Sequence, residues 1–298
     1  MSQGSQKGLR MTGRGFARLR GADGWWFLAP ALLGLVVLLL VMLVLQRPPW
    51  SAHSLDRVQQ RGELRIGYAP EPPYALLRAD GTPTGEGPIV AAEVARQLGL
   101  EPVWILTSFD RLIPELEARR FDVVAAGLFV TPARARRVRF SRPTLRVRQG
   151  WLQAAGAAAM PPSYAQAQPS AQHPIAVIEG SVEMAYFQPR AGADGLLVLP
   201  DAQAAAAAVA AGQAQALALS LPAVRALAAG SDGRLVARAG NSVGASLVAL
   251  ALHRDDTELA AAVDGVLAGY IGSAEHVAAL ASVGLSAKDL PDADAPRD

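Results

Sequence analysis

The residues best suited to bind a charged ligand begin at Gly127, in the run GLFVTPARARRVRFSRP. The apolar residues 121–126 before it are typical of a buried strand, and a glycine lets the backbone approach a ligand closely. Thr131 and Pro132 have the pattern of a helix start, in which a capping hydroxyl precedes a proline. Arg134 then falls on the first helical turn. Free amides beside a fixed guanidinium indicate an anion site, and the alternative is that Arg134 is one of five solvated arginines.

Apolar and turn patterns predict the elements that would hold this site. Strands are predicted at residues 64–68, 103–106, 121–126, 174–178, 196–199, 216–219 and 247–252. Helices are predicted at residues 55–60, 88–98 and 112–119, from Val182, from Asp201 to near Gly212, and at 258–281 with a break near Gly272. This alternation indicates an α/β protein with mainly parallel sheets and helices on both faces. Residues 153–174 are rich in Ala, Gln and Pro and give little structural signal.

The N-terminal part of the chain carries a candidate transmembrane helix. Trp25 to Leu45 is 21 residues without a charge, which at 1.5 Å per residue spans a hydrocarbon core of roughly 30 Å. The basic residues of the 1–24 tail place the N-terminus in the cytoplasm and the rest outside. We expect residues 46–55 to be a tether. A cleaved secretory signal is the alternative, and the length of the apolar run argues against it.

Charge and composition exclude several classes of function. Residues 1–24 carry a net charge of +4 and residues 25–47 add one arginine, so the total of +2 leaves −3 for residues 48–298. The body of the protein is therefore not basic, and the sequence predicts no nucleic-acid partner. There is no cysteine, and the four histidines lack ligand spacing. We therefore expect no disulfide, no metal site and no cofactor.

Two runs carry a family resemblance: GELRIGYAPEPPYALLRADGTPTGEG and LIPELEARRFDVVAAGLFVTPARARRVRFSRP. They resemble the family 3 extracellular solute-binding proteins, the polar-amino-acid-type receptors of ABC importers. The resemblance implies a two-lobe periplasmic-binding-protein (flytrap) fold. The first lobe would be discontinuous, with residues 56–149 and 246–285, the second lobe would be residues 150–245, and residues 286–298 would be a frayed tail. The ligand would lie between the lobes.

The resemblance also implies roles for individual residues. The arginine of the T-P-x-R motif, here Arg134, would hold the ligand's carboxylate, with Thr131 and Gly127 beside it. Tyr74 occupies the ligand-stacking aromatic position. Phe129 departs from the hydroxyl that family members commonly have there. Ser220 replaces the acid that usually meets an α-ammonium group.

These departures indicate a different way of holding the ligand's cation. Glu71 lies in a proline-stiffened loop, and Phe109 occupies a position that often faces the cleft, so with Tyr74 and Phe129 they predict a box for a bulky or delocalised cation. This spacing looks most like the ectoine- and hydroxyectoine-binding branch. The alternative is that Phe109 and Phe129 belong to the hydrophobic core and that Glu71 is a solvated loop residue.

The second lobe is expected to close over the ligand through one short segment. Gly180-Ser181-Val182 matches the family's G-[ST]-T motif, with Val182 losing one hydroxyl. Glu183 follows, either to bind the ligand or to complement the helix dipole.

The expected function is capture of a small zwitterion, an ectoine-like compatible solute or a polar amino acid, for an ABC permease. One alternative is a ligand-sensing subunit for a membrane receptor. Another is an enzyme resembling cyclohexadienyl dehydratases on the same fold, with Glu71 or Glu183 as the acid. Gly240 to Gly244 fits the pattern G-x-S-x-G, but a strand and not a helix is predicted to follow, so a hydrolase is not expected.

Overall fold

The computed structural model describes residues 33, 35–39, 42, 54–192, 194–240 and 246–292. Contacts within the chain divide it into two units, residues 1–48 and 49–298. In the first unit the described residues are helical and exposed. Among the described residues, no helix has the length and apolar character needed to cross a membrane. The predicted tail 1–24, most of the predicted span 25–45 and residues 46–53 of the predicted tether lie outside the described residues.

The second unit alternates strands and helices, as the sequence patterns predict. In its first half the elements are α2 (Ser54–Arg61), β1 (Glu63–Tyr68), β2 (Leu76–Leu77), β3 (Pro83–Thr84), α3 (Glu86–Gln97), β4 (Glu101–Leu106), η1 (Phe109–Arg111), α4 (Leu112–Glu117), β5 (Val123–Val124), α5 (Pro132–Ala135) and β6 (Val138–Val147). The second half contains β7 (Gln149–Ala154), η2 (Tyr164–Gln166), β8 (Ile175–Ile178), α6 (Val182–Phe187), β9 (Leu196–Leu199), α7 (Ala202–Ala210), β10 (Ala216–Ser220), α8 (Leu221–Ala229), β11 (Leu235–Ala239), β12 (Ser246–His253), α9 (Thr257–Tyr270), α10 (Ala274–Ser282) and η3 (Ala287–Asp289).

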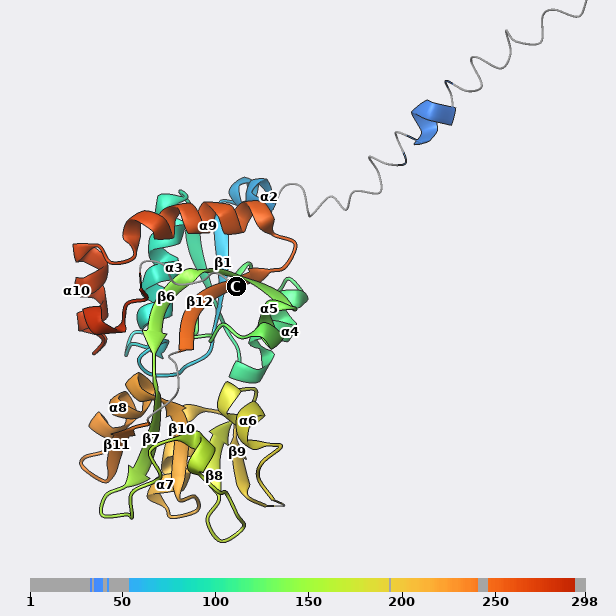
Figure 1. Ribbon diagram of the computed structural model, residues 1–298. Coiled ribbons are helices and arrows are strands. Elements are labelled where there is room, and N and C mark those ends of the chain that lie inside the picture. Colours follow the sequence, from blue (N-terminus) through green and yellow to red (C-terminus); the bar gives the residue numbers. More distant parts are fainter. Residues whose placement is uncertain are drawn as a thin grey trace, which may run out of the picture. The chain divides into compact units, whose positions relative to one another are not determined.

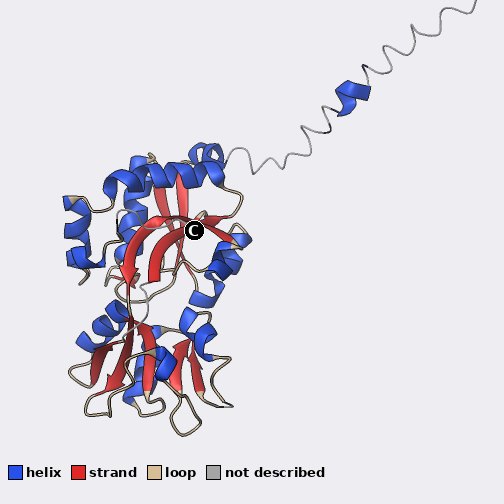
Figure 2. Ribbon diagram, viewed as in Figure 1, coloured by secondary structure: helices blue, strands red, loops and turns tan. Residues whose placement is uncertain are grey.

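These strands form two five-stranded sheets and a small hairpin of β2 and β3. The first sheet has the order β4-β1-β5-β12-β6, and the second has the order β11-β7-β10-β8-β9. We call each large sheet with its helices a lobe. The first lobe comprises α2 to β6 and β12 to η3, and the second lobe comprises β7 to β11. Figure 1 shows α3 and α9 at the first sheet and α7 and α8 at the second, and Figure 2 shows the same layers by type of element.

Each sheet is parallel except for one strand. In the first sheet β12 runs antiparallel to both of its neighbours, β5 and β6. In the second sheet β7 is antiparallel to both β10 and β11. Both exceptions are the first strand that the chain forms after it enters a lobe. They start at the boundary between the lobes, whereas the other strands end there, so the opposite direction follows from the two crossings.

Five strands were not predicted from the sequence: β2 and β3 of the small hairpin, and β6, β7 and β11 of the large sheets. Strand β6 carries Arg139, Arg142 and Arg146 among its buried residues, and these charges together with Pro143 hide the strand in the sequence. The strand predicted at residues 121–126 shortens to β5, because only Val123 and Val124 pair with the neighbouring strands.

Hydrophobic side chains fill both faces of the first sheet and continue between the lobes. Val58, Leu64, Val90 and Leu259 belong to one fully buried cluster, under α2, α3 and α9. A different cluster joins the lobes: Tyr74, Phe129 and Leu145 from the first lobe pack with Leu217 and Leu221 from the second. Burying apolar surface at the crossing ties the lobes together next to the site.

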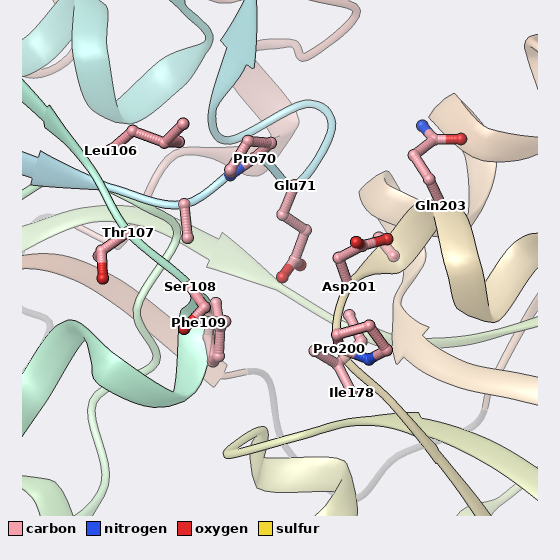
Figure 3. Close-up of a pocket in the computed structure, with 12 residues that line it drawn as sticks. Pro70, Glu71, Leu106, Thr107, Ser108, Phe109, Ile178, Pro200, Asp201 and Gln203 are labelled. Carbon is pink, nitrogen blue, oxygen red and sulfur yellow. The ribbon is translucent and has the colours of Figure 1, made fainter.

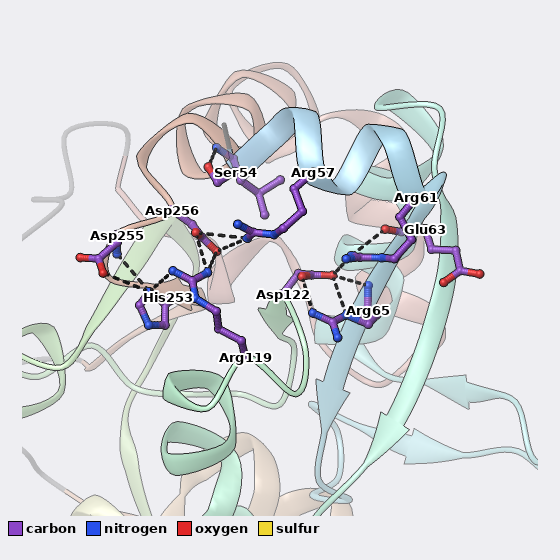
Figure 4. Close-up of polar contacts among 11 residues, drawn as sticks. Ser54, Arg57, Arg61, Glu63, Arg65, Arg119, Asp122, His253, Asp255 and Asp256 are labelled. Atoms are coloured by element: carbon purple, nitrogen blue, oxygen red, sulfur yellow. Dashed lines mark hydrogen bonds and ion pairs between the residues drawn. The ribbon is translucent and has the colours of Figure 1, made fainter. Parts of the chain in front are cut away.

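Two buried aspartates fix the part of the first lobe that is farthest along the strands from this crossing (Figure 4). Asp122 accepts a 3.0 Å bond from Arg65 Nη2 in β1 and another bond from Arg61 in α2. Asp256, at the start of α9, pairs with Arg57 and with Arg119, whose Nη1 lies 2.9 Å from Oδ1. The two carboxylates thus connect the ends of α2, α4, β5 and α9.

The predicted frayed tail is partly ordered. Ser286 and Asp289 form a capping box at η3, and Asp292 pairs with Arg146 of β6. Leu290 packs against the buried cluster between the lobes. The capping pattern gives residues 286–292 a defined structure, so the prediction of fraying is wrong for this segment.

Candidate functional site

The segment after β5 places Arg134 as the sequence predicts. Thr131 caps α5, its Oγ1 accepting the 3.2 Å hydrogen bond from Arg134 N, and Pro132 occupies the first helical position. The short helix begins on a segment that is itself held to β12, since Val130 N donates to Leu247 O. The backbone of Arg134 is therefore fixed on both sides before any ligand is considered.

The guanidinium of Arg134 points to the boundary between the lobes. Its Nη1 donates a 3.0 Å bond to the carbonyl of Phe129, and its Nη2 donates a 3.1 Å bond to the carbonyl of Gly180 in the second lobe. Its Cζ lies 5.7 Å from the centre of the Phe109 ring. These two bonds use two of the five N–H donors of a guanidinium, which leaves three donors for other acceptors.

Glu71 lines a cavity of about 410 Å³ between the lobes. The loop after β1 turns tightly at this residue, because its carbonyl accepts from the amides of both Tyr74 and Ala75. The first lobe contributes segments 69–71 and 106–109 to the wall, and the second lobe contributes Ile178 and segment 200–203. Figure 3 shows the Glu71 side chain extended into this space. Glu71 is only 6% exposed, so its carboxyl group is shielded from bulk solvent.

The charged groups of the site influence one another's pKa values. Burial raises the pKa of Glu71 to about 8, with a further contribution from the charge of Glu183 and a smaller opposing one from Arg134. Burial also raises the pKa of Glu183 to about 7. Burial lowers the pKa of Arg134 to about 10, against the attraction of Glu183 and Glu71. A half-buried cation with two buried acids nearby is suited to a ligand that carries both signs of charge.

Tyr74 and Ser220 join the lobes instead of lining this cavity. The Tyr74 hydroxyl donates a 2.7 Å bond to Ser220 Oγ, which also accepts from Ala223 N as the cap of α8. The Tyr74 ring is fully buried, and burial raises its pKa well above the usual value. Gly127, at φ +67°, lies under this ring, and a Cβ there would be 2.5 Å from Tyr74 Cγ. The glycine is thus needed for the ring's position, and its predicted contact with a ligand stays a prediction.

The second-lobe segment lies opposite Arg134. Ser181 caps α6, with its Oγ accepting a 3.0 Å bond from Met184 N. Gly180 passes so close to the first lobe that a Cβ there would lie 2.8 Å from Asp110 Cα. Val182 is half-buried and packs on the cluster between the lobes, while Glu183 is buried. The serine hydroxyl thus serves as a helix cap.

The predicted residues therefore form two groups. Arg134, Phe109, Glu71 and Glu183 are gathered by geometry and charge around the boundary between the lobes. Phe109 lines both the cavity that contains Glu71 and a smaller one of about 230 Å³ that contains Arg134. The rings of Tyr74 and Phe129 belong to the buried cluster, so their predicted contact with a ligand stays a prediction.

Sequence reasoning missed several residues on the second-lobe wall of the larger cavity. Asp201 and Gln203 line it together with Pro200 and Ile178. Asp201 was predicted only as a helix cap, and it does cap α7. Its second role was not visible because it depends on how the two lobes meet, which no local pattern encodes. Thr107 and Ser108 on the first-lobe wall follow β4, and polar residues after a strand were the available signal.

Comparison with known proteins gives a consistent result. The sequence profile of the bacterial extracellular solute-binding proteins, family 3, matches residues 64–278. A probable amino-acid ABC transporter periplasmic-binding protein, y4tE of Sinorhizobium fredii, is 36% identical over 105 residues. That match covers 34% of this chain and 35% of the relative, so it spans about a third of the relative's length.

Solved structures share the fold over a larger part of the chain. The crystal structure of EhuB in complex with hydroxyectoine has 27% sequence identity and a TM-score of 0.72, covering 78% of this chain and 93% of that one. The structure of holo ArgBP from T. maritima has 25% identity and a TM-score of 0.67, covering 75% and 96%. The two-lobe periplasmic-binding-protein fold expected from the sequence is confirmed.

Proposed function

The chain belongs to the bacterial extracellular solute-binding proteins of family 3, and on this basis we propose that it captures a small zwitterion for an ABC importer. The ligand is an ectoine-like compatible solute or a polar amino acid. The proposed first lobe of the protein is residues 56–149 together with residues 246–285. The proposed second lobe is residues 150–245. Ligand binding favours the closed arrangement of the lobes, which the permease recognises.

Arg134 is proposed to hold the ligand's carboxylate. A helix cap fixes its backbone, and its Phe129 and Gly180 bonds fix its guanidinium from both lobes. A planar guanidinium in a shielded site binds a carboxylate through paired charge-assisted hydrogen bonds. Because one of the fixing bonds comes from the second lobe, carboxylate binding and lobe closure are linked.

Glu71 is proposed to hold the ligand's cation, with Phe109 beside it. Ser220 Oγ is already used by Tyr74 and by the α8 cap, so no acid stands at the place predicted for an α-ammonium partner. Glu71 and the aromatic ring of Phe109 would instead bind the positive group of the ligand, at a different place in the site. A delocalised cation suits such a carboxylate and ring. The likeness to EhuB, at 27% identity, supports ectoine-type zwitterions as the first ligands to test.

The binding unit is proposed to be attached to the cytoplasmic membrane by residues 25–45, with the N-terminus in the cytoplasm and the lobes periplasmic or extracellular. The support is the uncharged run between Trp25 and Leu45 and the basic residues before it. Mass spectrometry of the mature protein tests this directly. A mature chain that starts near Ser51 would replace the anchor with a cleaved signal.

The observation that carries the proposal is a half-buried arginine, Arg134, and a buried glutamate, Glu71, whose carboxyl group has no hydrogen bond or ion pair within the described residues, at one boundary between two lobes. A thermal-shift screen of ectoines, betaines and amino acids tests it, because a ligand that binds only the folded state raises the melting temperature. At least one zwitterion should shift the transition by several degrees, and calorimetry should give a one-to-one complex. If no zwitterion binds, the importer-receptor proposal is wrong.

An enzyme on the same fold is the second candidate function. It is favoured by the pKa of about 8 for Glu71, because a carboxylic acid that keeps its proton near neutral pH can act as a general acid. Turnover of a cyclohexadienyl substrate such as prephenate, lost in Glu71→Gln, would support it. Tight binding without turnover favours the receptor. A sensing role is separated by whether the protein copurifies with a permease or with a membrane receptor.

A further inference from the structure

The cavity between the lobes has a second carboxylate on its far wall. Asp201 lies at the start of α7 in the second lobe, and its Oδ1 accepts a 2.8 Å hydrogen bond from Ala204 N. Its side chain is exposed, and its other oxygen has no hydrogen-bond partner among the described residues. Glu71 and Asp201 line the same cavity from opposite lobes, as Figure 3 shows.

Glu71 has the properties of a ligand-binding residue. Its carboxyl group is more than nine-tenths buried and points into the cavity. Within the described part of the chain, no hydrogen bond or ion pair holds it, so the side chain is not explained by internal structure. A buried acid without a partner is costly, and proteins keep such groups where a ligand completes them.

We propose that Asp201 is a further ligand-binding residue, which together with Glu71 holds the ligand's cationic group between the lobes. This inference rests on the proposed function of the same site. The rest of the wall is largely apolar, with Leu106, Phe109, Ile178 and Pro200. A cation there has two acceptors on opposite sides and hydrophobic contacts around its body.

This geometry selects a class of cation. To reach two carboxylates on opposite walls, the cation must carry at least two N–H donors that point apart, as a planar amidinium or guanidinium does. A quaternary ammonium group has no N–H donor and gains only the diffuse attraction of charge and ring. The site therefore prefers amidinium- or guanidinium-containing zwitterions to betaines.

The same pair makes closure depend on the ligand. Each acid belongs to a different lobe, so at a pH above about 8, where Glu71 is ionised, closure without a cation brings two negative groups toward one another, which is unfavourable. With a cation bound between the two acids, the electrostatic contribution to closure becomes favourable. The bond to Asp201 forms only when the second lobe has closed, and it therefore contributes to the ligand's preference for the closed form.

Because Asp201 is also a helix cap, the test must keep the cap and remove the charge. Asparagine and serine cap helices about as well as aspartate, so Asp201→Asn and Asp201→Ser both preserve α7. Asp80→Asn is the matched control, since Asp80 likewise accepts a backbone amide, from Thr82, at an exposed turn outside the cavity. Melting temperatures without ligand verify that all three variants fold as the wild type does.

The experiment is calorimetry on the full chain with ectoine, L-arginine and glycine betaine. We expect Asp201→Asn and Asp201→Ser to weaken the binding of the amidinium or guanidinium ligand by about three- to fivefold. Asp80→Asn should leave it unchanged, and glycine betaine should bind the wild type weakly and equally in all variants.

The outcomes separate this inference from the proposed function. If Asp201→Asn and Asp201→Ser bind as tightly as the wild type while Arg134→Ala does not, Asp201 is a cap only and the inference is overturned. A wild type that prefers glycine betaine overturns the selected class of cation. If the wild type binds none of the three ligands, nor any zwitterion in the wider screen, the proposed function fails and the inference fails with it.

Discussion

The hydroxyl group of Tyr74 donates a 2.7 Å hydrogen bond to Oγ of Ser220, so a loop of the first lobe is bonded to the end of a strand in the second. Both side chains are buried, and Ser220 caps α8 with the same oxygen. The bond therefore occupies the position where an acid was expected for an α-amino-acid ligand. Position 220, where the acid was expected, thus contributes a bond between the lobes.

Removing this bond should loosen the contact between the lobes. Tyr74→Phe keeps the ring and leaves Ser220 Oγ bonded to Ala223 N, so we expect a loss of about 1 kcal/mol in the free energy of unfolding. Urea denaturation measures it. Ser220→Ala should cost more, because it also removes the α8 cap and leaves the Tyr74 hydroxyl buried without a partner. Equal stability of Tyr74→Phe and wild type would show that the bond contributes nothing.

Arg134→Ala should weaken ligand binding by roughly 30-fold or more, because breaking a desolvated charge pair costs about 2–5 kcal/mol and each 1.4 kcal/mol is about tenfold. Calorimetry on the ligand found in the screen measures the change. Arg136→Ala is the control, since this exposed arginine is two residues away at the end of α5. Wild-type affinity in Arg134→Ala would remove Arg134 from the site.

Gly127→Ala should destabilise the fold through Tyr74. A methyl group at this position meets the Tyr74 ring at 2.5 Å and also takes a backbone φ of +67°. Gly212→Ala provides the comparison, because its φ is +73° and no atom lies within 4 Å of the added Cβ. We expect Gly127→Ala to lose about 1–3 kcal/mol more than Gly212→Ala in the free energy of unfolding. Equal losses would mean that the ring moves aside freely.

Binding of a cationic ligand should strengthen as pH rises from 6 to about 9. Without ligand the pKa of Glu71 is about 8 and that of Glu183 about 7, so both are largely protonated at pH 6. The cation binds the ionised acids better and lowers their pKa values, so binding releases protons in this range. Calorimetry in buffers of different ionisation enthalpy counts these protons.

The variant Glu71→Gln removes one of the two titrating acids, so it separates the effect of Glu71 on the pH dependence of binding from that of Glu183. It should bind more weakly at pH 8 and lose most of the rise in affinity above pH 7, where Glu71 titrates. An affinity for the wild type that stays constant or falls between pH 6 and 9 would contradict the assignment of the cation to Glu71.

Residues 51–298 should fold as a soluble domain when separated from the predicted membrane span. Residues 49–298 form one contact unit, and the buried clusters of both lobes lie within it. Expression of residues 51–298 followed by thermal unfolding monitored by circular dichroism should show a cooperative transition. An insoluble product that no ligand rescues would contradict both the boundary and the independence of the fold.

The sequence predicted the elements whose signals are local. Thr131 and Asp201 cap helices, Ser181 precedes α6, and strand 196–199 has the predicted bounds, because each depends on a few neighbouring residues. Strand β6 was missed since its arginines lie on the exposed positions of a half-buried strand. The order of the strands also required knowledge of partners far away in the chain.

The candidate site divides in the same way. Arg134 and Glu71 were found because motifs and stiff loops surround them. The burial of Tyr74 and Phe129 between the lobes, and the position of Asp201 opposite Glu71, depend on how the lobes meet. A single sequence contains no pattern with that information, since Tyr74 is 146 residues from its partner Ser220, and Glu71 and Asp201 lie in different lobes.

The two crossings between the lobes are paired with each other on both sides. Val147 pairs with Ser246 in the first sheet, and Gly150 pairs with Ala239 in the second, with only Arg148 and Gln149 between these two positions of the first crossing. Paired strands on each side of the crossings resist sliding past one another, because sliding would break their hydrogen bonds. Lobe motion should therefore follow one arc, and a single distance across the opening describes it. Because the chain has no cysteine, two introduced cysteines carrying spin labels, one on each lobe, are sufficient to follow that distance as ligand is added.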